Sequence, residues 1–118
     1  MRYDLIKNPR IFEVNGFKIK DYGKIYLKDG EMVSFVTQSN KECDFTAMDW
    51  GFYLGPSING RLKNQGFKVA LVLNEYGKLY VNAVEIDKID EFKKYLKTNQ
   101  NSTILCWLDD WLSEKTEI

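Results

Sequence analysis

Apolar and polar residues alternate through the first third of the chain, and this alternation restricts the possible fold more than any other feature of the sequence. Successive side chains of a strand point to opposite faces, so a period of two is typical of half-buried β-strands. Three turn signals, whose Asn-Gly and Asp-Gly pairs accept the positive φ angles of tight hairpin turns, interrupt the pattern at Asn15-Gly16, Asp21-Tyr22-Gly23 and Asp29-Gly30. The sequence therefore predicts short antiparallel hairpins, with apolar strand positions at Ile11, Val14, Phe17, Ile19, Ile25, Leu27, Val33 and Phe35.

The second half of the chain carries signals for two helices among further strands. Ser57 is a residue type that caps helices, and Gly66 lies where a left-handed C-terminal cap is expected. Asp87 precedes apolar residues at helical spacing, which predict a helix at about residues 88–98. Strands are predicted over residues 67–73, 78–85 and 103–108, with the first two paired antiparallel.

These patterns together predict an α+β fold, an antiparallel sheet of short hairpins backed by two helices. From residue 57 onward the order is helix, strand, strand, helix, strand. This order matches a ferredoxin-like β-α-β-β-α-β arrangement if an earlier strand supplies the first edge. A chain of 118 residues, 44% of them hydrophobic, fits a single domain over residues 1–118.

Charge and hydropathy exclude two classes of partner. Seventeen basic and seventeen acidic residues cancel, so the chain lacks the basic field with which proteins bind nucleic acid. The longest aliphatic run, residues 69–73, is far shorter than the roughly 20 residues that span a bilayer. With no apolar leader of the secretory type at its start, the chain is expected to be cytoplasmic and to have no membrane partner.

The chain contains no histidine, which rules out histidine-based catalytic triads, histidine-ligated zinc and histidine acid–base chemistry within a single chain. Cys43 and Cys106 are far apart and lack chelating spacing. We therefore expect both thiols to be buried and reduced, with no metal and no cofactor.

Residues 43–68 mix aromatic, charged and hydroxyl side chains with glycines, as a small-molecule pocket requires. Residues 55–61 predict a glycine-containing turn into a helix start, where free N–H groups and Arg61 favour a phosphate or carboxylate. In the alternative interpretation, Ser57 only caps the helix and Arg61 is solvated. The predicted ligand-binding residues are Trp50, Tyr53, Ser57, Asn59 and Arg61.

Asp44 and Asp49 are the candidates for catalysis, one as base and one as acid. Their odd separation of five would place them on opposite faces of a strand, which disfavours a shared role. The catalytic residues, if the protein is an enzyme, are otherwise unknown.

Several short motifs resemble a group of small uncharacterised bacterial proteins associated with surface-glycan biosynthesis. They are Asp44-Phe45-Thr46, Trp50-Gly51-Phe52-Tyr53, Pro56-Ser57-Ile58-Asn59-Gly60-Arg61-Leu62, Gly66-Phe67-Lys68 and Trp107-Leu108-Asp109. The resemblance covers residues 43–109 and brings no established catalytic residue. It implies a role beside enzymes that act on nucleotide sugars or acidic sugars.

Three functions follow as hypotheses, and whether the protein is an enzyme stays open. The first is a small-molecule-binding or accessory module of surface-glycan metabolism that recognises an anionic small molecule or sugar. The second is a small enzyme that acts on an activated sugar with an aspartate base. The third is a protein-interaction domain that binds its partner through a sheet edge or through the C-terminal tail around Trp111.

Overall fold

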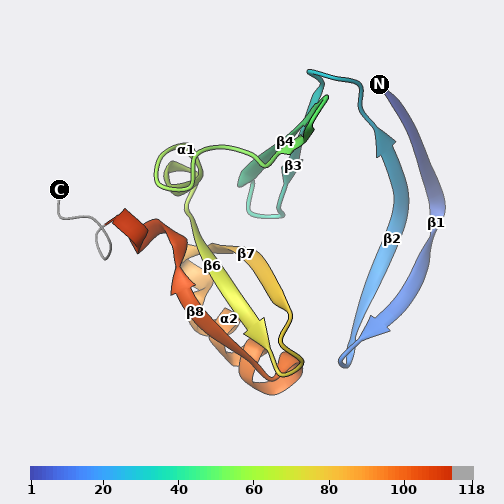
Figure 1. Ribbon diagram of the computed structural model, residues 1–118. Helices are drawn as coiled ribbons and strands as arrows, with labels where there is room; N and C mark the ends of the chain where they lie inside the picture. Colours follow the sequence, from blue (N-terminus) through green and yellow to red (C-terminus); the bar gives the residue numbers. More distant parts are fainter. Residues whose placement is uncertain (113–118) are drawn as a thin grey trace. The chain divides into compact units, whose positions relative to one another are not determined.

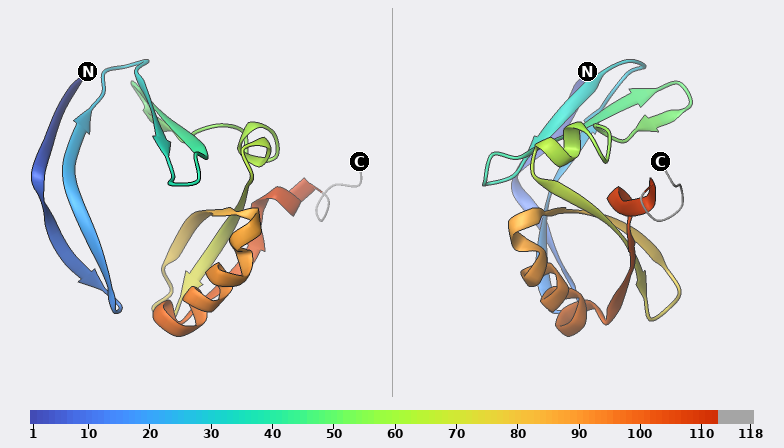
Figure 2. Two further views of the ribbon diagram at one scale, coloured as in Figure 1. Left: turned by 180° about the vertical axis from the view of Figure 1, so that it is seen from behind. Right: turned by 90° about the vertical axis from the view of Figure 1, so that its left-hand side faces the viewer.

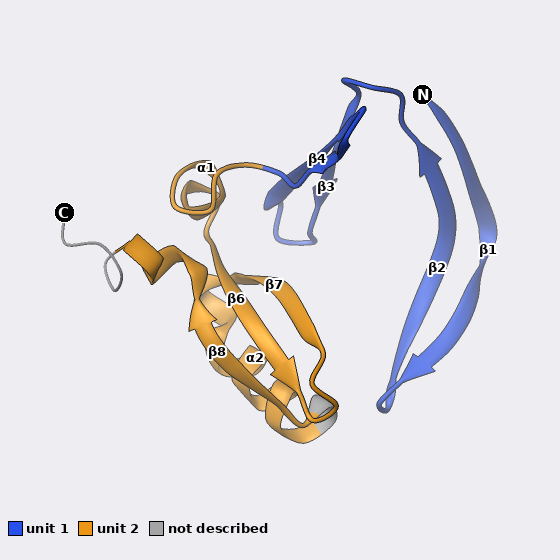
Figure 3. Cartoon of the chain, viewed as in Figure 1, with its two compact units in different colours: residues 1–55 blue, residues 56–118 orange. Residues whose placement is uncertain are grey.

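The computed structural model describes residues 1–112 apart from the side chains of residues 99 and 100. Its chain divides into two compact units, Met1–Gly55 and Pro56–Ile118 (Figure 3). The described residues form three antiparallel sheets with two short α-helices, so the fold class is α+β, as predicted. That residues 1–118 form a single domain stays a prediction. Among the described residues, no helix is long and apolar enough to cross a membrane.

The first sheet is a long hairpin of β1 (Arg2–Val14) and β2 (Phe17–Tyr26), which pair antiparallel (Figure 1). Asn15 and Gly16 connect the two strands with φ angles of 47° and 89°. Both angles are positive, as a two-residue hairpin turn requires. This part of the sequence prediction is confirmed.

The predicted turn at Asp21-Tyr22-Gly23 is wrong, because these residues lie inside β2. The pairing passes from Leu5 with Gly23 to Arg10 with Asp21, which leaves residues 6–9 of β1 opposite Tyr22 alone. Gly23 has a φ of 119°, and its N–H donates to the Asp21 Oδ1 at 3.0 Å. The glycine and the aspartate thus support a bulge in a continuous strand rather than a reversal of the chain.

The second sheet contains β3 (Met32–Val36), β4 (Glu42–Met48) and β5 (Gly51–Tyr53) in the order β3-β4-β5. Asp29 and Gly30 do form a turn, but the strands on either side belong to different sheets, so the predicted hairpin there is wrong. The turn is held by β4 and the residue that follows it instead. The Gly30 N–H donates to the Ala47 carbonyl at 2.7 Å, and the Asp49 N–H donates to the Asp29 Oδ1 at 3.0 Å.

The second unit contains an antiparallel sheet in the order β7-β6-β8. Its pairing of β6 with β7 confirms the predicted hairpin over residues 67–85. The ferredoxin-like arrangement is not confirmed, since this sheet has three strands among the described residues. Its elements are α1 (Arg61–Asn64), β6 (Phe67–Asn74), β7 (Leu79–Glu85), the 3₁₀ turn η1 (Ile86–Lys88), α2 (Ile89–Tyr95), the π-helical turn η2 (Leu96–Gln100), β8 (Ser102–Trp107) and the 3₁₀ turn η3 (Leu108–Asp110).

The helix predicted at residues 88–98 is found as α2, extended by η1 and η2, and it lies against one face of the sheet (Figure 2). Ala70, Val72 and Leu96 form the buried core between helix and sheet. Four partly buried side chains pack around this core: Phe92, Tyr95, Ile104 and Trp107.

Candidate functional site

The five predicted ligand-binding residues are divided between the two units. Trp50 and Tyr53 belong to the first unit, and Ser57, Asn59 and Arg61 belong to the second. Each group is therefore described within its own unit.

In the first unit, polar side chains gather on one face of the β3-β4-β5 sheet. Ser34 pairs with Asp44 across β3 and β4, and Thr46 pairs with Tyr53 across β4 and β5. Paired residues share a face, as do residues two apart on a strand, so all four lie on the same face. We call Ser34, Asp44, Thr46 and Tyr53 the polar face.

Asp44 and Ser34 are joined by a hydrogen bond on the polar face. The Ser34 hydroxyl donates to the Asp44 Oδ1 at 2.8 Å. Asp44 is the buried partner, with 7% of its surface exposed, whereas Ser34 is exposed. Sequence reasoning missed Ser34, because only the register of β3 against β4 identifies it.

Gly55 permits a close approach of the chain to Asp44. Its φ is 70°, and a Cβ atom there would lie 2.7 Å from the Asp44 carbonyl oxygen and 3.2 Å from the Cys43 Sγ. Both the left-handed backbone and the short distance require glycine. Cys43 and Cys106 are half-buried, not fully buried as the sequence predicted.

Trp50 and Tyr53 present exposed aromatic rings at the end of the same sheet. Trp50 lies in the turn between β4 and β5 with 67% of its surface exposed, and Tyr53 ends β5 with 54% exposed. Asp49 is exposed in this turn, beyond the strand that holds Asp44. Catalytic roles for Asp44 and Asp49 stay predictions.

In the second unit, Ser57 accepts hydrogen bonds from the first turn of the short helix α1, whose N-cap residue is Gly60. The Ser57 Oγ accepts the Arg61 N–H at 3.0 Å, and the Ser57 carbonyl accepts the Leu62 N–H at 3.0 Å. Gly66 has the left-handed conformation expected after the helix, with a φ of 94°. Arg61 and Asn59 are exposed at the start of α1. Ser57 thus bonds to the first turn of α1, but it is not the N-cap residue that the sequence predicted.

The C-terminal motif at residues 107–109 contacts strand β6. The Asp109 Oδ2 accepts the Val69 N–H at 2.7 Å, next to the last paired position of β6 with β8. The Lys68 ammonium lies 3.2 Å from the Asp110 carboxylate and 5.1 Å from the centre of the Trp107 ring. Trp111 is exposed, and residues 113–118 of the tail predicted to bind a partner lie outside the described residues.

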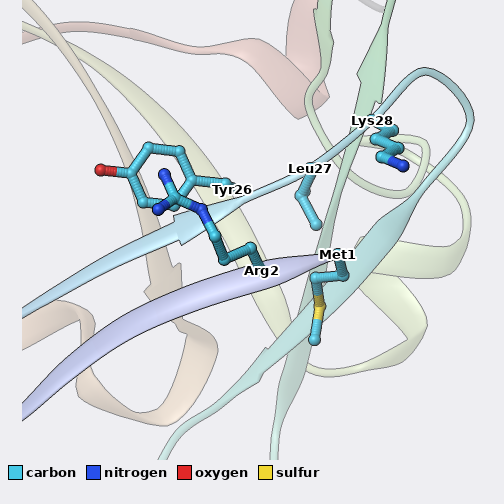
Figure 4. A pocket seen from close by; sticks show the side chains of 5 residues that line it. All are labelled: Met1, Arg2, Tyr26, Leu27 and Lys28. Atoms are coloured by element: carbon cyan, nitrogen blue, oxygen red, sulfur yellow. The ribbon is translucent and has the colours of Figure 1, made fainter.

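A cavity of about 360 Å³ opens beside the first residues of β1 and the end of β2. Arg2 and Tyr26 are cross-strand partners, and the Arg2 Cζ lies 4.0 Å from the centre of the Tyr26 ring (Figure 4). No sequence pattern indicates this region, since the pairing of Arg2 with Tyr26 depends on the register beyond the β1–β2 bulge. The lining residues are Met1, Arg2, Tyr26, Leu27 and Lys28.

Glu31 bonds to two of the residues that line this cavity. The Lys28 N–H donates to its Oε1 at 2.6 Å, and the α-ammonium of Met1 donates to its Oε2 at 3.0 Å. The Lys28 N–H first, and then the ammonium, stabilise the ionised form and hold the pKa of Glu31 below its ordinary value of 4.5.

We expect Glu31 to titrate below pH 4.5 in the folded protein. Because the pKa is lowered on folding, these contacts stabilise the fold above the ordinary value, and their contribution is lost as the pH falls through the lowered pKa. NMR titration of the side-chain carboxyl carbon measures this midpoint, and Glu31→Gln identifies the resonance by removing it. A midpoint at or above 4.5 would contradict the two contacts.

No protein-family model, curated protein or solved structure matches the chain. The candidate sites therefore rest on the chemistry and geometry of the chain itself.

Proposed function

We propose that the protein is a small-molecule-binding or accessory module that recognises an anionic, sugar-type ligand. The observation that carries this proposal is that the β3-β4-β5 sheet has both the polar face and, in the turn between β4 and β5, the exposed ring of Trp50. Hydroxyl and carboxylate groups pair with the hydroxyls of a sugar, and an exposed aromatic ring offers a stacking surface to its apolar side. Ligand sites typically combine an apolar surface with a small number of convergent polar groups.

The setting that we propose is bacterial surface-glycan metabolism, which follows from the resemblance of residues 43–109. Arg61 is the candidate contact for an anionic group in the second unit, because its side chain is exposed and a guanidinium binds carboxylate or phosphate with two hydrogen bonds. Trp50 and Arg61 are tested separately, since each belongs to a different unit.

A thermal-shift screen with N-acetylneuraminate, UDP-N-acetylglucosamine and inorganic phosphate tests the proposal, because a ligand that binds only the folded state raises the unfolding temperature. We expect at least one of the two sugars to raise it in a dose-dependent manner. Trp50→Ala should lower the affinity for that sugar by about tenfold or more, as expected for a lost stacking contact. In a separate test of the second unit, Arg61→Gln should weaken the binding of inorganic phosphate by about tenfold or more, since a charge-assisted hydrogen bond contributes about 1.5–3 kcal/mol.

Tyr76→Ala is the matched control, because this ring is also highly exposed and lies in the turn between β6 and β7, which the proposal does not use. Its affinity for the sugar should equal that of the wild type. The proposal fails if neither sugar shifts the unfolding temperature. It also fails if Trp50→Ala and Tyr76→Ala bind with the same affinity as the wild type.

A further inference from the structure

The cavity at the open end of the β1–β2 hairpin contains none of the residues on which the proposed function rests. We infer that it is a separate binding site for a small organic anion, one that joins a carboxylate or phosphate group to an apolar body. This inference stands on the side chains of residues 1–31 alone.

The orientation of Arg2 is the first argument. Its guanidinium lies over the ring of Tyr26 at 4.0 Å, and Figure 4 shows the two groups against each other. An aromatic ring beneath the plane of a guanidinium holds the group in one orientation and leaves the N–H donors at its rim accessible. A carboxylate or phosphate binds such a rim with two parallel hydrogen bonds.

The charge around the cavity is the second argument. Among the described residues, the ion-pair partner of Arg2 is Asp4, 3.8 Å away and largely exposed, which is beyond the length of a hydrogen bond. The Lys28 ammonium has no ion pair with a described residue. Glu31 accepts bonds from the Lys28 N–H and the Met1 ammonium, so it is already occupied. The side-chain cations of Arg2 and Lys28 are thus left to attract an anion.

Size and lining are the third argument. A volume of about 360 Å³ falls at the lower end of the roughly 300–1,000 Å³ range of small-molecule sites. Met1 and Leu27 lie beside Arg2 and Tyr26 and supply an apolar surface (Figure 4). A metabolite-sized anion with an apolar body satisfies both the cations and this surface, whereas an inorganic ion would use only the cations.

Arg10 provides a matched comparison within the same strand. Its guanidinium also lies near a ring, 4.9 Å from the centre of Phe12, but it donates to the Asp21 Oδ2 at 3.0 Å. Arg10 is therefore neutralised by a bonded carboxylate, which Arg2 is not.

Calorimetric titration of the full chain with phenyl phosphate, benzoate and benzamide tests the inference. Benzamide has the shape of benzoate without its charge. We expect phenyl phosphate or benzoate to bind saturably. The one that binds more tightly shows whether the site prefers a phosphate or a carboxylate. Benzamide should bind about tenfold more weakly or not at all. Arg2→Gln should lower the affinity for the anion by about tenfold or more. Lys28→Gln should lower this affinity by a smaller factor, and Arg10→Gln should leave it unchanged.

NMR spectra of β1 and β2 in each variant show whether the hairpin is intact, and Lys28→Gln keeps the test decisive if Arg2→Gln disrupts it. The inference is overturned if neither anion binds, if benzamide binds as well as benzoate, or if both variants bind like the wild type. Loss of binding in Trp50→Ala would also overturn it, because the anion would then occupy the site of the proposed function. Unchanged binding in Trp50→Ala supports an anion site that does not involve Trp50, whatever the outcome of the sugar screen.

Discussion

Replacing Gly23 with alanine is expected to separate β1 from β2 around the bulge. A Cβ atom at this position would overlap the Asp4 carbonyl oxygen and lie 3.3 Å from the Leu5 Cα. Both are backbone atoms of the paired strand, so no flexible side chain can move aside. The φ of 119° adds a backbone conformation that residues with a Cβ rarely adopt. We expect the free energy of unfolding of this hairpin to fall by about 3 kcal/mol or more.

Gly30→Ala is the matched control for backbone strain. Its φ of 83° is also positive, but a Cβ atom there would meet nothing within 4 Å. Only the conformational cost remains, about 1–2 kcal/mol. Hydrogen exchange of the β1 and β2 amides measures the local stability in Gly23→Ala, and exchange of the β3 and β4 amides measures it in Gly30→Ala. Equal loss of protection in Gly23→Ala and Gly30→Ala would contradict the close approach of β2 to Asp4.

Replacing Leu96 with alanine is expected to destabilise the second unit strongly. Leu96 is 5% exposed and lies in one cluster with Ala70 and Val72, enclosed by the rings of Phe92 and Trp107. Truncation removes buried apolar surface and leaves a cavity between η2 and the sheet. Such substitutions cost about 2–5 kcal/mol.

Leu105→Ala removes the same atoms from β8, where 50% of the leucine is exposed. Its cost should stay below about 1 kcal/mol, since little apolar surface is lost from the interior. Chemical denaturation followed by the fluorescence of the tryptophans compares the two variants. A similar cost for both would show that Leu96 is not part of a packed core.

The hairpin of β6 and β7 could be predicted from the sequence because its signals are local. The Asn74 Oδ1 accepts the N–H groups of Tyr76 and Lys78, each at 2.9 Å, and Gly77 has a φ of 77°. Residue types within a single turn fix this geometry. The same holds for the turn at Asn15-Gly16.

The first unit was less predictable because the same residue types form a hairpin turn in one context and a β-bulge in another. Both structures use an aspartate that accepts a nearby N–H and a glycine with positive φ. At Asp21 and Gly23 the long-range pairing with β1 decides for the bulge. No local pattern contains that information.

The candidate sites illustrate the same limit. Trp50 and Tyr53 were predicted from the residue types of one segment, and both are exposed as a stacking surface requires. Ser34 and Asp44 meet only through the register of two strands, and so do Arg2 and Tyr26. Register depends on how whole strands align, so these pairs appear only in the folded chain.

The most direct test of ligand recognition uses whichever of N-acetylneuraminate and UDP-N-acetylglucosamine raises the unfolding temperature. This sugar is titrated calorimetrically into the wild type, Trp50→Ala and Tyr76→Ala. The proposed function predicts saturable binding to the wild type and to Tyr76→Ala with the same affinity. For Trp50→Ala it predicts a loss of about tenfold or more, with unchanged thermal stability of the unliganded protein because the ring is exposed. Equal affinities in all three proteins would contradict recognition of this sugar at the end of the β3-β4-β5 sheet.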